Sequence, residues 1–355
     1  MTIAALAREE LRALQPYEAA QQVADTIRLN ANEAPWSGKT DRCRRPLNRY
    51  PEIRPARLAQ ALADYFGCDP SRLLVTRGTS EAIDLLIRAF CREGKDNIVT
   101  TAPTFSMYGH YATVQGAEYR AVETAPDENF AIDNDALLAA CDERTRLIFI
   151  CSPNNPTGTL VPRPALVDLL ERRGQRSAIV VDEAYIEFSG ESSTVELLDQ
   201  YSNLIVLRTL SKALAFAGAR CGAVMGPADV IRILNAIQAP YAMATPVVES
   251  VEDALDAAAI DEARGRVAEV VAERERLMAA LSSFSFVDTV WPSAANFFLI
   301  RAVNSDAVIN DARNAGILLR DFGSSLPNCI RITVGAKPEN DRLLGLLATI
   351  DKGTS

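Results

Sequence analysis

The sequence predicts an α/β protein with two domains: a large one with a mostly parallel sheet flanked by helices, and a smaller α+β domain. Its 355 residues correspond to roughly two domains at about 150 residues each. The composition, 48% hydrophobic and 23% charged, is that of an ordinary globular protein. From about residue 72 to 225, short β-branched runs alternate with helical patterns, whereas the pattern differs beyond about residue 245.

The strands expected in the large domain are nearly continuous in apolar residues, as strands covered on both faces must be. They comprise residues 73–76, 97–101, 147–151, 178–182 and 203–207. Between them, residues 80–91 and 163–174 carry apolar side chains at helical spacing. Strand and helix therefore alternate as in a parallel sheet with helices on both faces.

The C-terminal part is expected to form the smaller domain. Residues 257–281 predict one long amphipathic helix, interrupted only by Gly265, and 297–302 and 329–335 are expected to be strands. No Gly/Ser linker separates the halves, so the long helix is expected to join them. We predict an N-terminal arm at 1–28, a large domain at 29–245 and a small domain at 246–355. The first residues of the large domain are candidates to pack with the small domain.

Charge and composition exclude several classes of protein. The net charge is −9, and no basic tract is longer than a pair of arginines, so no nucleic-acid partner is expected. The first twenty residues contain acidic side chains from position 9 onward and lack a long apolar run. We therefore expect a short amphipathic arm and neither a signal peptide nor a membrane partner. Seven scattered cysteines fit buried thiols in a reducing cytoplasm.

Histidine chemistry is also restricted, because the chain contains one histidine, His110. It cannot build a histidine-based metal site, and any Ser-His-Asp or Cys-His device would have to use it. We interpret His110 as a surface or partly buried helix residue and expect no metal.

Three central strands end in polar residues. The first leads into Asn155, the second ends at Asp182 and is followed by Tyr185, and the third leads through Thr209 and Ser211 to Lys212. Ligands of open α/β sheets bind beyond the carboxyl ends of the strands, so these groups are expected to converge on one crevice. Taken singly, Asn155 could be a turn former, Asp182 a helix N-cap and Lys212 a solvated lysine. Together, a desolvated carboxylate and ammonium need a ligand that carries both kinds of charge.

A phosphate site is expected beside this crevice. Residues 73–90 read as a strand, a turn at Gly78-Thr79-Ser80 and a helix whose free N–H groups suit an anion, although Thr79 or Ser80 could simply cap that helix. Ser211 and Arg220 would add a hydroxyl and a guanidinium. Pyridoxal 5′-phosphate requires a lysine for its Schiff base, a carboxylate for its ring nitrogen and donors for its phosphate, which these residues supply.

The motifs resemble those of a known family. They are S-P-N-N-P-T-G at 152–158, D-E-A-Y at 182–185 and T-L-S-K-A-x-x-x-A-G-x-R-C-G at 209–222, with L-N-A-N-E at 29–33, N-R-Y-P-E at 48–52, L-L-I-R-A-F-C at 85–91, I-L-L-R-D at 317–321 and R-I-T-V-G at 331–335. By these the chain resembles the histidinol-phosphate aminotransferases, which are fold-type I pyridoxal-phosphate-dependent enzymes of the class-II aminotransferase subgroup. The likeness spans about 29–335.

The resemblance implies a role for each matching residue. Lys212 would carry the internal aldimine and, once released, act as the base, while Asp182 would pair with the ring nitrogen. Asn155 and Tyr185 would bond the phenolate oxygen, and Phe105 would stack on the ring. The remaining cofactor-binding residues of the same subunit would be Thr79, Ser80, Glu81, Thr209, Ser211 and Arg220. Tyr50 would reach the cofactor phosphate of the neighbouring subunit, which implies an obligate homodimer with shared active sites.

The implied reaction is transamination between L-histidinol phosphate and 2-oxoglutarate (glutamate) in L-histidine biosynthesis, through a pyridoxamine phosphate intermediate. Arg331 would grip the carboxylate of glutamate and, with Arg320, the phosphate of histidinol phosphate. Tyr17 and Glu33 would line the substrate pocket, and Asn155 would also contact substrate.

Two departures from the family pattern affect specificity. Phe105 stands where the family often has Tyr, and Thr79-Ser80-Glu81 replaces a common Ala-Asp-Glu. Either change could broaden the range of amino donors or acceptors. Two alternatives therefore remain: an aromatic amino-acid aminotransferase, and a related enzyme, including a decarboxylase, that acts on an amino-acid or amino-alcohol phosphate. A ligand-sensing domain of a transcription regulator is a further alternative, although only about 28 residues precede the first motif.

Overall fold

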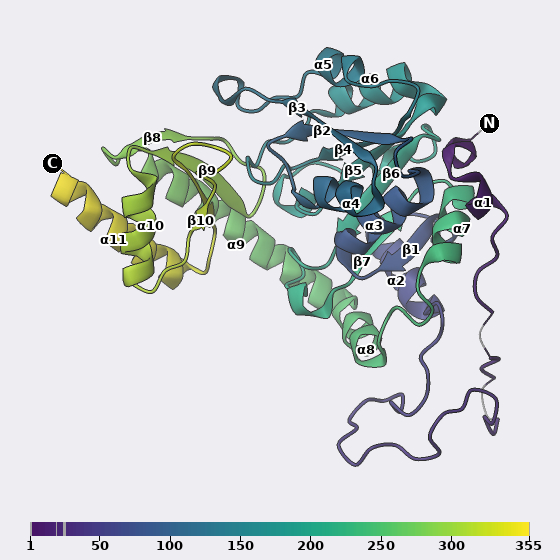
Figure 1. Ribbon diagram of the computed structural model, residues 1–355. Coiled ribbons are helices and arrows are strands. Elements are labelled where there is room, and N and C mark those ends of the chain that lie inside the picture. Colours follow the sequence, from purple (N-terminus) through teal and green to yellow (C-terminus); the bar gives the residue numbers. More distant parts are fainter. Residues whose placement is uncertain (1, 19, 24–25, 355) are drawn as a thin grey trace.

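The computed structural model describes residues 2–18, 20–23 and 26–354 and confirms the α/β class, with one large and one small sheet (Figure 1). The large sheet has the order β1-β7-β6-β5-β4-β2-β3. Its strands are β1 (Leu73–Thr76), β2 (Asn97–Ala102), β3 (Glu118–Glu123), β4 (Thr145–Cys151), β5 (Ala178–Asp182), β6 (Leu204–Thr209) and β7 (Gly222–Met225). The run from β3 to β6 is parallel, whereas β7 is antiparallel to both β6 and β1.

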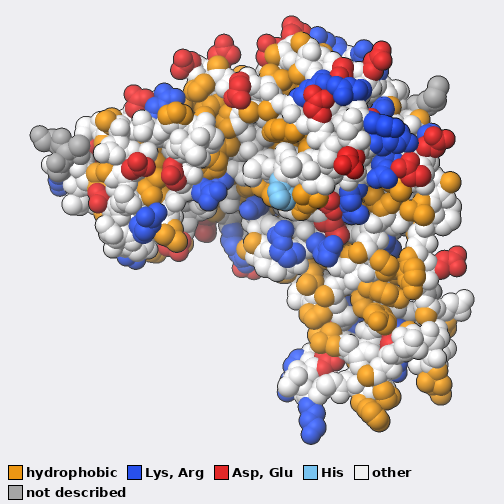
Figure 2. Space-filling model, viewed as in Figure 1, with side chains coloured by type: hydrophobic (Ala, Val, Ile, Leu, Met, Phe, Trp, Pro, Cys, Tyr) orange, Lys and Arg blue, Asp and Glu red, His pale blue; other side chains and the backbone are white. Residues whose placement is uncertain are grey.

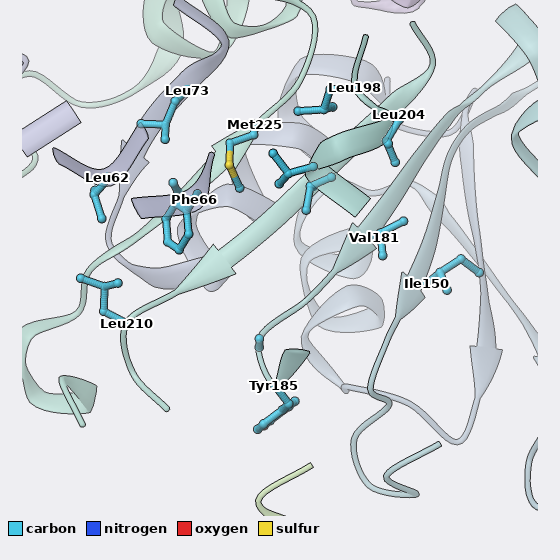
Figure 3. Close-up of a cluster of buried hydrophobic side chains, with 14 of the residues drawn as sticks. Leu62, Phe66, Leu73, Ile150, Val181, Tyr185, Leu198, Leu204, Leu210 and Met225 are labelled. Atoms are coloured by element: carbon cyan, nitrogen blue, oxygen red, sulfur yellow. The ribbon is translucent and has the colours of Figure 1, made fainter. Parts of the chain in front are cut away.

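Both faces of the large sheet are covered, which explains the unbroken apolar runs of its strands. In β4, Phe149 belongs to one core cluster and Ile148 and Ile150 to the other, as the two-residue period of a strand requires. Figure 3 shows side chains of the second of these clusters, from Leu62 and Phe66 near Met225 across the sheet to Val181 and Ile150.

Helices from distant parts of the sequence supply the two covering layers. One layer contains α3 (Gly78–Phe90), α4 (Met107–Gln115) and α7 (Ala228–Ile237). The other contains α2 (Ala56–Phe66), α6 (Arg163–Arg173) and α8 (Thr245–Ala254), with the short α5 (Asn134–Ala139) beside α6. Single 3₁₀ turns occur at Ile3–Leu6, Pro70–Arg72, Pro126–Glu128, Gly174–Arg176, Ile186–Phe188, Thr194–Leu197 and Ala217–Ala219.

The small sheet is antiparallel, in the order β10-β11-β9-β8. Its strands are β8 (Val287–Val290), β9 (Phe297–Ala302), β10 (Arg320–Asp321) and β11 (Cys329–Thr333). Helices α10 (Ser305–Asn314) and α11 (Lys337–Thr354) pack with it around a separate apolar core. Helix α10 ends before Gly316, whose φ is +74°.

Helix α9 (Ala257–Leu281) connects the two sheets and has the predicted bounds (Figure 1). Ala263 near its start is buried in the core of the large sheet, and Leu277 and Leu281 near its end are buried in the core of the small sheet. The buried Arg274 donates to the carbonyls of Phe188 at 3.2 Å and Ala295 at 2.9 Å, one in each half. The predicted interruption at Gly265 is wrong: the helix is continuous there, because packing at both ends outweighs the ~1 kcal/mol cost of one glycine.

The N-terminal segment differs from the compact body. The 3₁₀ turn at Ile3–Leu6 and α1 (Glu9–Arg12) pack on α7, with Ile3 fully buried. Much of the described chain between there and α2 extends away from the rest, as Figure 1 shows. Within the described residues, eight of the twelve exposed large hydrophobic side chains lie between positions 14 and 50, and Figure 2 shows hydrophobic side chains gathered in this part of the molecule. Residues 1, 19, 24 and 25 of the predicted arm lie outside the described residues.

The predicted division at residue 245 coincides with the start of α8 and stays a prediction. Arg44 and Arg45, early in the range assigned to the large domain, contact α8 through Glu249, Glu252 and Asp253. In the described part of the chain, no helix is long and apolar enough to cross a membrane.

Candidate active site

A cavity of about 220 Å³ lies at the carboxyl ends of β4, β5 and β6, where the sequence predicts a crevice. Eleven of the predicted residues lie in its wall: Thr79, Ser80, Phe105, Asn155, Asp182, Tyr185, Thr209, Ser211, Lys212, Arg220 and Arg331. The sheet brings Asp182 level with Cys151 of β4 and Leu207 of β6, so residues far apart in sequence meet at one edge. Cys151 and Ala184 complete the wall.

Lys212 follows β6 and is largely withdrawn from water. Its Nζ lies 5.5 Å from the centre of the Tyr185 ring, and within the described residues it has no hydrogen bond or ion pair. Burial lowers the pKa of the Lys212 ammonium, and the positive charges of Arg331 and Arg220 lower it further against the opposing effect of Asp182. A lysine with a lowered pKa presents more neutral amine, the form that attacks a carbonyl.

Asp182 at the end of β5 is 1% exposed and accepts two hydrogen bonds. Tyr108 Oη donates to its Oδ2 at 2.9 Å, and the Ala184 N–H donates to Oδ1 at 3.2 Å. Burial raises the pKa of this carboxyl to about 6, with the bond from Tyr108 acting in the opposite direction. A carboxylate held here is suited to a cationic partner group in the cavity.

The start of α3 forms the anion-binding end of the cavity. Among the residues that the structure describes, no side chain caps the N-terminus of the helix, so the capping alternative for Thr79 and Ser80 is wrong. The first N–H groups remain available to a ligand. Gly78 has φ +73°, and a Cβ there would lie 2.9 Å from Arg220 Nη2, so the guanidinium approaches the helix start over a glycine. Arg220 Nη1 also donates to Ser211 Oγ at 3.3 Å, and Thr209 Oγ1 donates to Ser211 Oγ at 2.9 Å.

Arg331 of β11 brings the small sheet into the site. Its Nη1 donates to Asn155 Oδ1 at 2.5 Å, and its guanidinium lies 5.1 Å and 5.4 Å from the ring centres of Phe297 and Phe322. Burial lowers the pKa of Arg331, and its Nε has no hydrogen-bond partner among the described residues. A guanidinium close to two rings, with its Nε donor unpaired among the described residues, suits a planar anion.

The other predicted residues lie outside the cavity wall. Glu81 pairs with Arg77, accepting from its backbone N–H at 2.6 Å, and so closes the turn before α3. Arg320 is exposed but is the register partner of Arg331 across β10 and β11. Tyr17 is 59% exposed and Tyr50 is 50% exposed, both on the extended N-terminal segment.

Glu33, expected in the substrate pocket, is engaged elsewhere in this chain. Its carboxylate accepts from Arg28 at 2.5 Å, Arg49 at 2.8 Å and the Tyr50 N–H at 2.8 Å. Burial raises its pKa, but these bonds and charges leave it below its ordinary value. Glu33 therefore holds the backbone that carries Tyr50.

Two residues that contact predicted site residues carry no prediction from the sequence. Tyr108 binds Asp182, and Tyr241 stacks on Tyr50 with ring centres 4.7 Å apart. Tyr108 lies three residues after Phe105, which precedes α4, and meets its ring edge-on, but no sequence pattern indicates the bond to Asp182. Tyr241 has φ +55°, unusual for an aromatic residue, but no sequence pattern indicates it.

Comparisons with known proteins agree with this geometry. The chain is 42% identical over 355 residues to the histidinol-phosphate aminotransferase of Xylella fastidiosa, covering 98% of this chain and 97% of the relative. It is also 42% identical to that of Escherichia coli O45:K1 over 351 residues, covering 98% of each.

Solved structures show the same fold. The histidinol-phosphate aminotransferase from Sinorhizobium meliloti in complex with pyridoxal-5′-phosphate has a TM-score of 0.79 at 24% identity, covering 87% of this chain and 84% of that one. The enzyme of the same name from Clostridium acetobutylicum has a TM-score of 0.78 at 23% identity, covering 86% and 92%. The model of the family described as aminotransferase class I and II matches residues 16–350. The chain therefore belongs to the class I and II aminotransferases.

Proposed function

We propose that this chain is a pyridoxal-phosphate-dependent aminotransferase that transfers an amino group between L-histidinol phosphate and 2-oxoglutarate in histidine biosynthesis. The observation that carries the proposal is the meeting of Lys212, Asp182 and the uncapped start of α3 in one cavity. The identity to curated histidinol-phosphate aminotransferases over nearly the whole chain supports the substrate.

The residues present fit pyridoxal phosphate. The helix start, Ser211 and Arg220 would hold its phosphate, and the glycine at position 78 leaves the room that a Cβ would fill. Asp182 would face the ring nitrogen, Phe105 would cover the ring, and Asn155 and Tyr185 would bond its phenolate oxygen. When bound, the cofactor supplies a reactive aldehyde and an electron-accepting ring that stabilises negative charge on the substrate's α-carbon.

The chain's own residues would then handle the protons. Lys212, with its lowered pKa, is suited to remove the proton from the substrate's α-carbon and to return one in the reverse direction. Asp182, buried and doubly hydrogen-bonded, would keep a proton on the ring nitrogen.

Two arginines favour an anionic substrate. Arg331 points a partly unsatisfied guanidinium toward Asn155, and Arg320 lies opposite it in the same sheet. Histidinol phosphate presents a phosphate and no α-carboxylate, whereas glutamate presents carboxylates, and a planar fork can bind either anion.

The proposed enzyme is a homodimer. The extended segment exposes Leu29 at 91% and Trp36 at 81%, which is unusual for apolar side chains unless a partner covers them. Tyr50 lies on this segment and outside its own cavity wall, in keeping with a role at the partner's phosphate site. Mixing inactive Tyr50→Phe and Lys212→Ala variants should restore part of the activity through hybrid dimers. No recovery after confirmed subunit exchange would refute the shared site.

A single-turnover panel tests the function. Protein loaded with pyridoxal phosphate is mixed with histidinol phosphate, phenylalanine, tyrosine or glutamate, and conversion of the cofactor is followed by absorbance. Histidinol phosphate and glutamate should convert it efficiently. Borohydride should fix the cofactor to the Lys212 peptide, and the same adduct in Lys212→Ala would contradict the assignment.

A further inference from the structure

Tyr108 lies outside the cavity wall and donates a hydrogen bond to the carboxylate of Asp182, which lines the cavity. It is fully buried on α4, and its hydroxyl donates to Asp182 Oδ2 at 2.9 Å. Its ring stacks on Phe149 of β4, with centres 4.8 Å apart and planes 18° apart, while Phe105 meets it edge-on at 5.7 Å. Tyr108 is therefore fixed by packing on one side and contacts the residue proposed to cover the ring on the other.

We propose that Tyr108 is a positioning residue that orients Asp182 and keeps it ionised toward the pyridine nitrogen of the cofactor. This role rests on the proposed function, because it assumes that Asp182 meets that nitrogen. A buried carboxylate without donors takes up a proton, and a protonated Asp182 could not hold a second proton on the ring.

The surroundings of Asp182 leave Tyr108 as the main support of its charge. The other polar groups that face it are Cys151, Glu183, Tyr185 and Lys212. Glu183 adds negative charge and opposes ionisation of Asp182, whereas Lys212 favours it. Once Lys212 is occupied by the cofactor its ammonium no longer contributes as such, so the hydroxyl of Tyr108 and the Ala184 N–H remain the direct donors in the described structure.

Tyr108→Phe removes only the hydroxyl and keeps the ring stacked on Phe149. Tyr111→Phe is the matched control: it lies one turn further along α4, is partly buried, and faces Asp84 and Glu81 in place of the cavity. Both variants and the unaltered protein are reconstituted with ¹⁵N-labelled pyridoxal phosphate, and the pH at which the ring nitrogen loses its proton is measured by NMR.

We expect the nitrogen of Tyr108→Phe to lose its proton at lower pH than in Tyr111→Phe and the unaltered protein. The Kd of Tyr108→Phe for the cofactor should rise roughly ten- to a hundredfold, which is the loss of affinity that corresponds to one hydrogen bond to a charged group. In an Asp182→Asn background, adding Tyr108→Phe should change Kd little, because the charge that the hydroxyl supports is gone.

The outcomes separate this role from the function on which it depends. Failure of the unaltered protein to bind the cofactor at Lys212 would overturn the proposed function. If it binds and Tyr108→Phe matches Tyr111→Phe in the nitrogen titration, Tyr108 does not position Asp182. A loss of affinity on adding Tyr108→Phe that is as large in the Asp182→Asn background would likewise overturn the proposal, since it would reflect packing alone.

Discussion

Gly78→Ala tests whether the start of α3 and Arg220 bind the cofactor phosphate together. A non-glycine residue at φ +73° costs ~1–2 kcal/mol, so the free energy of unfolding should fall by about that amount. The new Cβ would lie 2.9 Å from Nη2, the far end of a flexible side chain, so Arg220 can move aside at little cost in stability. The movement takes one charge-assisted donor from the phosphate, worth roughly 1.5–3 kcal/mol. The Kd for pyridoxal phosphate should therefore rise about ten- to a hundredfold.

Gly67→Ala is the matched control. Gly67 ends α2 with φ +76°, and no heavy atom of the described part of the chain lies within 4 Å of a Cβ built there. This variant therefore carries the same backbone strain away from the cavity. Urea unfolding of the apoproteins should show similar losses of stability, whereas cofactor titration should separate the two variants. Equal Kd values for Gly78→Ala and Gly67→Ala would refute the assigned role of the helix start.

Three further results are expected. Because burial raises the pKa of Asp182 to about 6, ionisation of this carboxyl destabilises the folded apoprotein as the pH rises from about 4 to 6. The free energy of unfolding of Asp182→Asn should therefore exceed that of the unaltered protein by up to ~3 kcal/mol at pH 8 and equal it at pH 4. Turnover of Asp182→Asn should nevertheless fall by orders of magnitude. An equal gain in urea unfolding at both pH values would contradict this. Arg331→Gln should raise the pKa of Lys212 and shift the midpoint pH of covalent cofactor binding to Lys212 upward, whereas Arg320→Gln should not. Identical midpoints in the two variants would exclude an effect of the Arg331 charge on Lys212. Arg331→Lys should lower kcat/KM for histidinol phosphate about tenfold or more through loss of the planar fork, and steady-state kinetics showing no loss would refute that contact.

Much of the large sheet could be predicted because its strands are buried on both faces. The runs at 73–76, 147–151 and 178–182 are apolar apart from Thr76 and Asp182 at their ends. The structure has strands with the bounds 73–76 and 178–182, and β4 begins two residues before the run at 147–151, at Thr145. Strand β3, by contrast, is an edge strand whose residues are mostly polar or exposed, and β7 is four residues long and begins with a glycine. β3 therefore lacks the apolar run that marks a buried strand, whereas β7 is apolar but too short to be recognised by its pattern.

The site could be predicted where chemistry is placed by strand ends, and not where it depends on tertiary contacts. Lys212, Asp182 and Asn155 follow successive strands of one sheet, so topology alone brings them together. Tyr108 enters through a helix that packs under that sheet, and the pairing of Glu33 with Arg28 and Arg49 depends on the path of an irregular segment. No local periodicity determines either contact.

The sharing of α9 between two cores has a consequence for how the protein unfolds. Neither half can lose this helix without exposing apolar surface in the other, and Arg274 would leave buried carbonyls in both halves unpaired. The two halves are thus coupled thermodynamically in spite of having separate sheets. Calorimetry should show one cooperative transition, where a pair of domains joined by a flexible linker would give two.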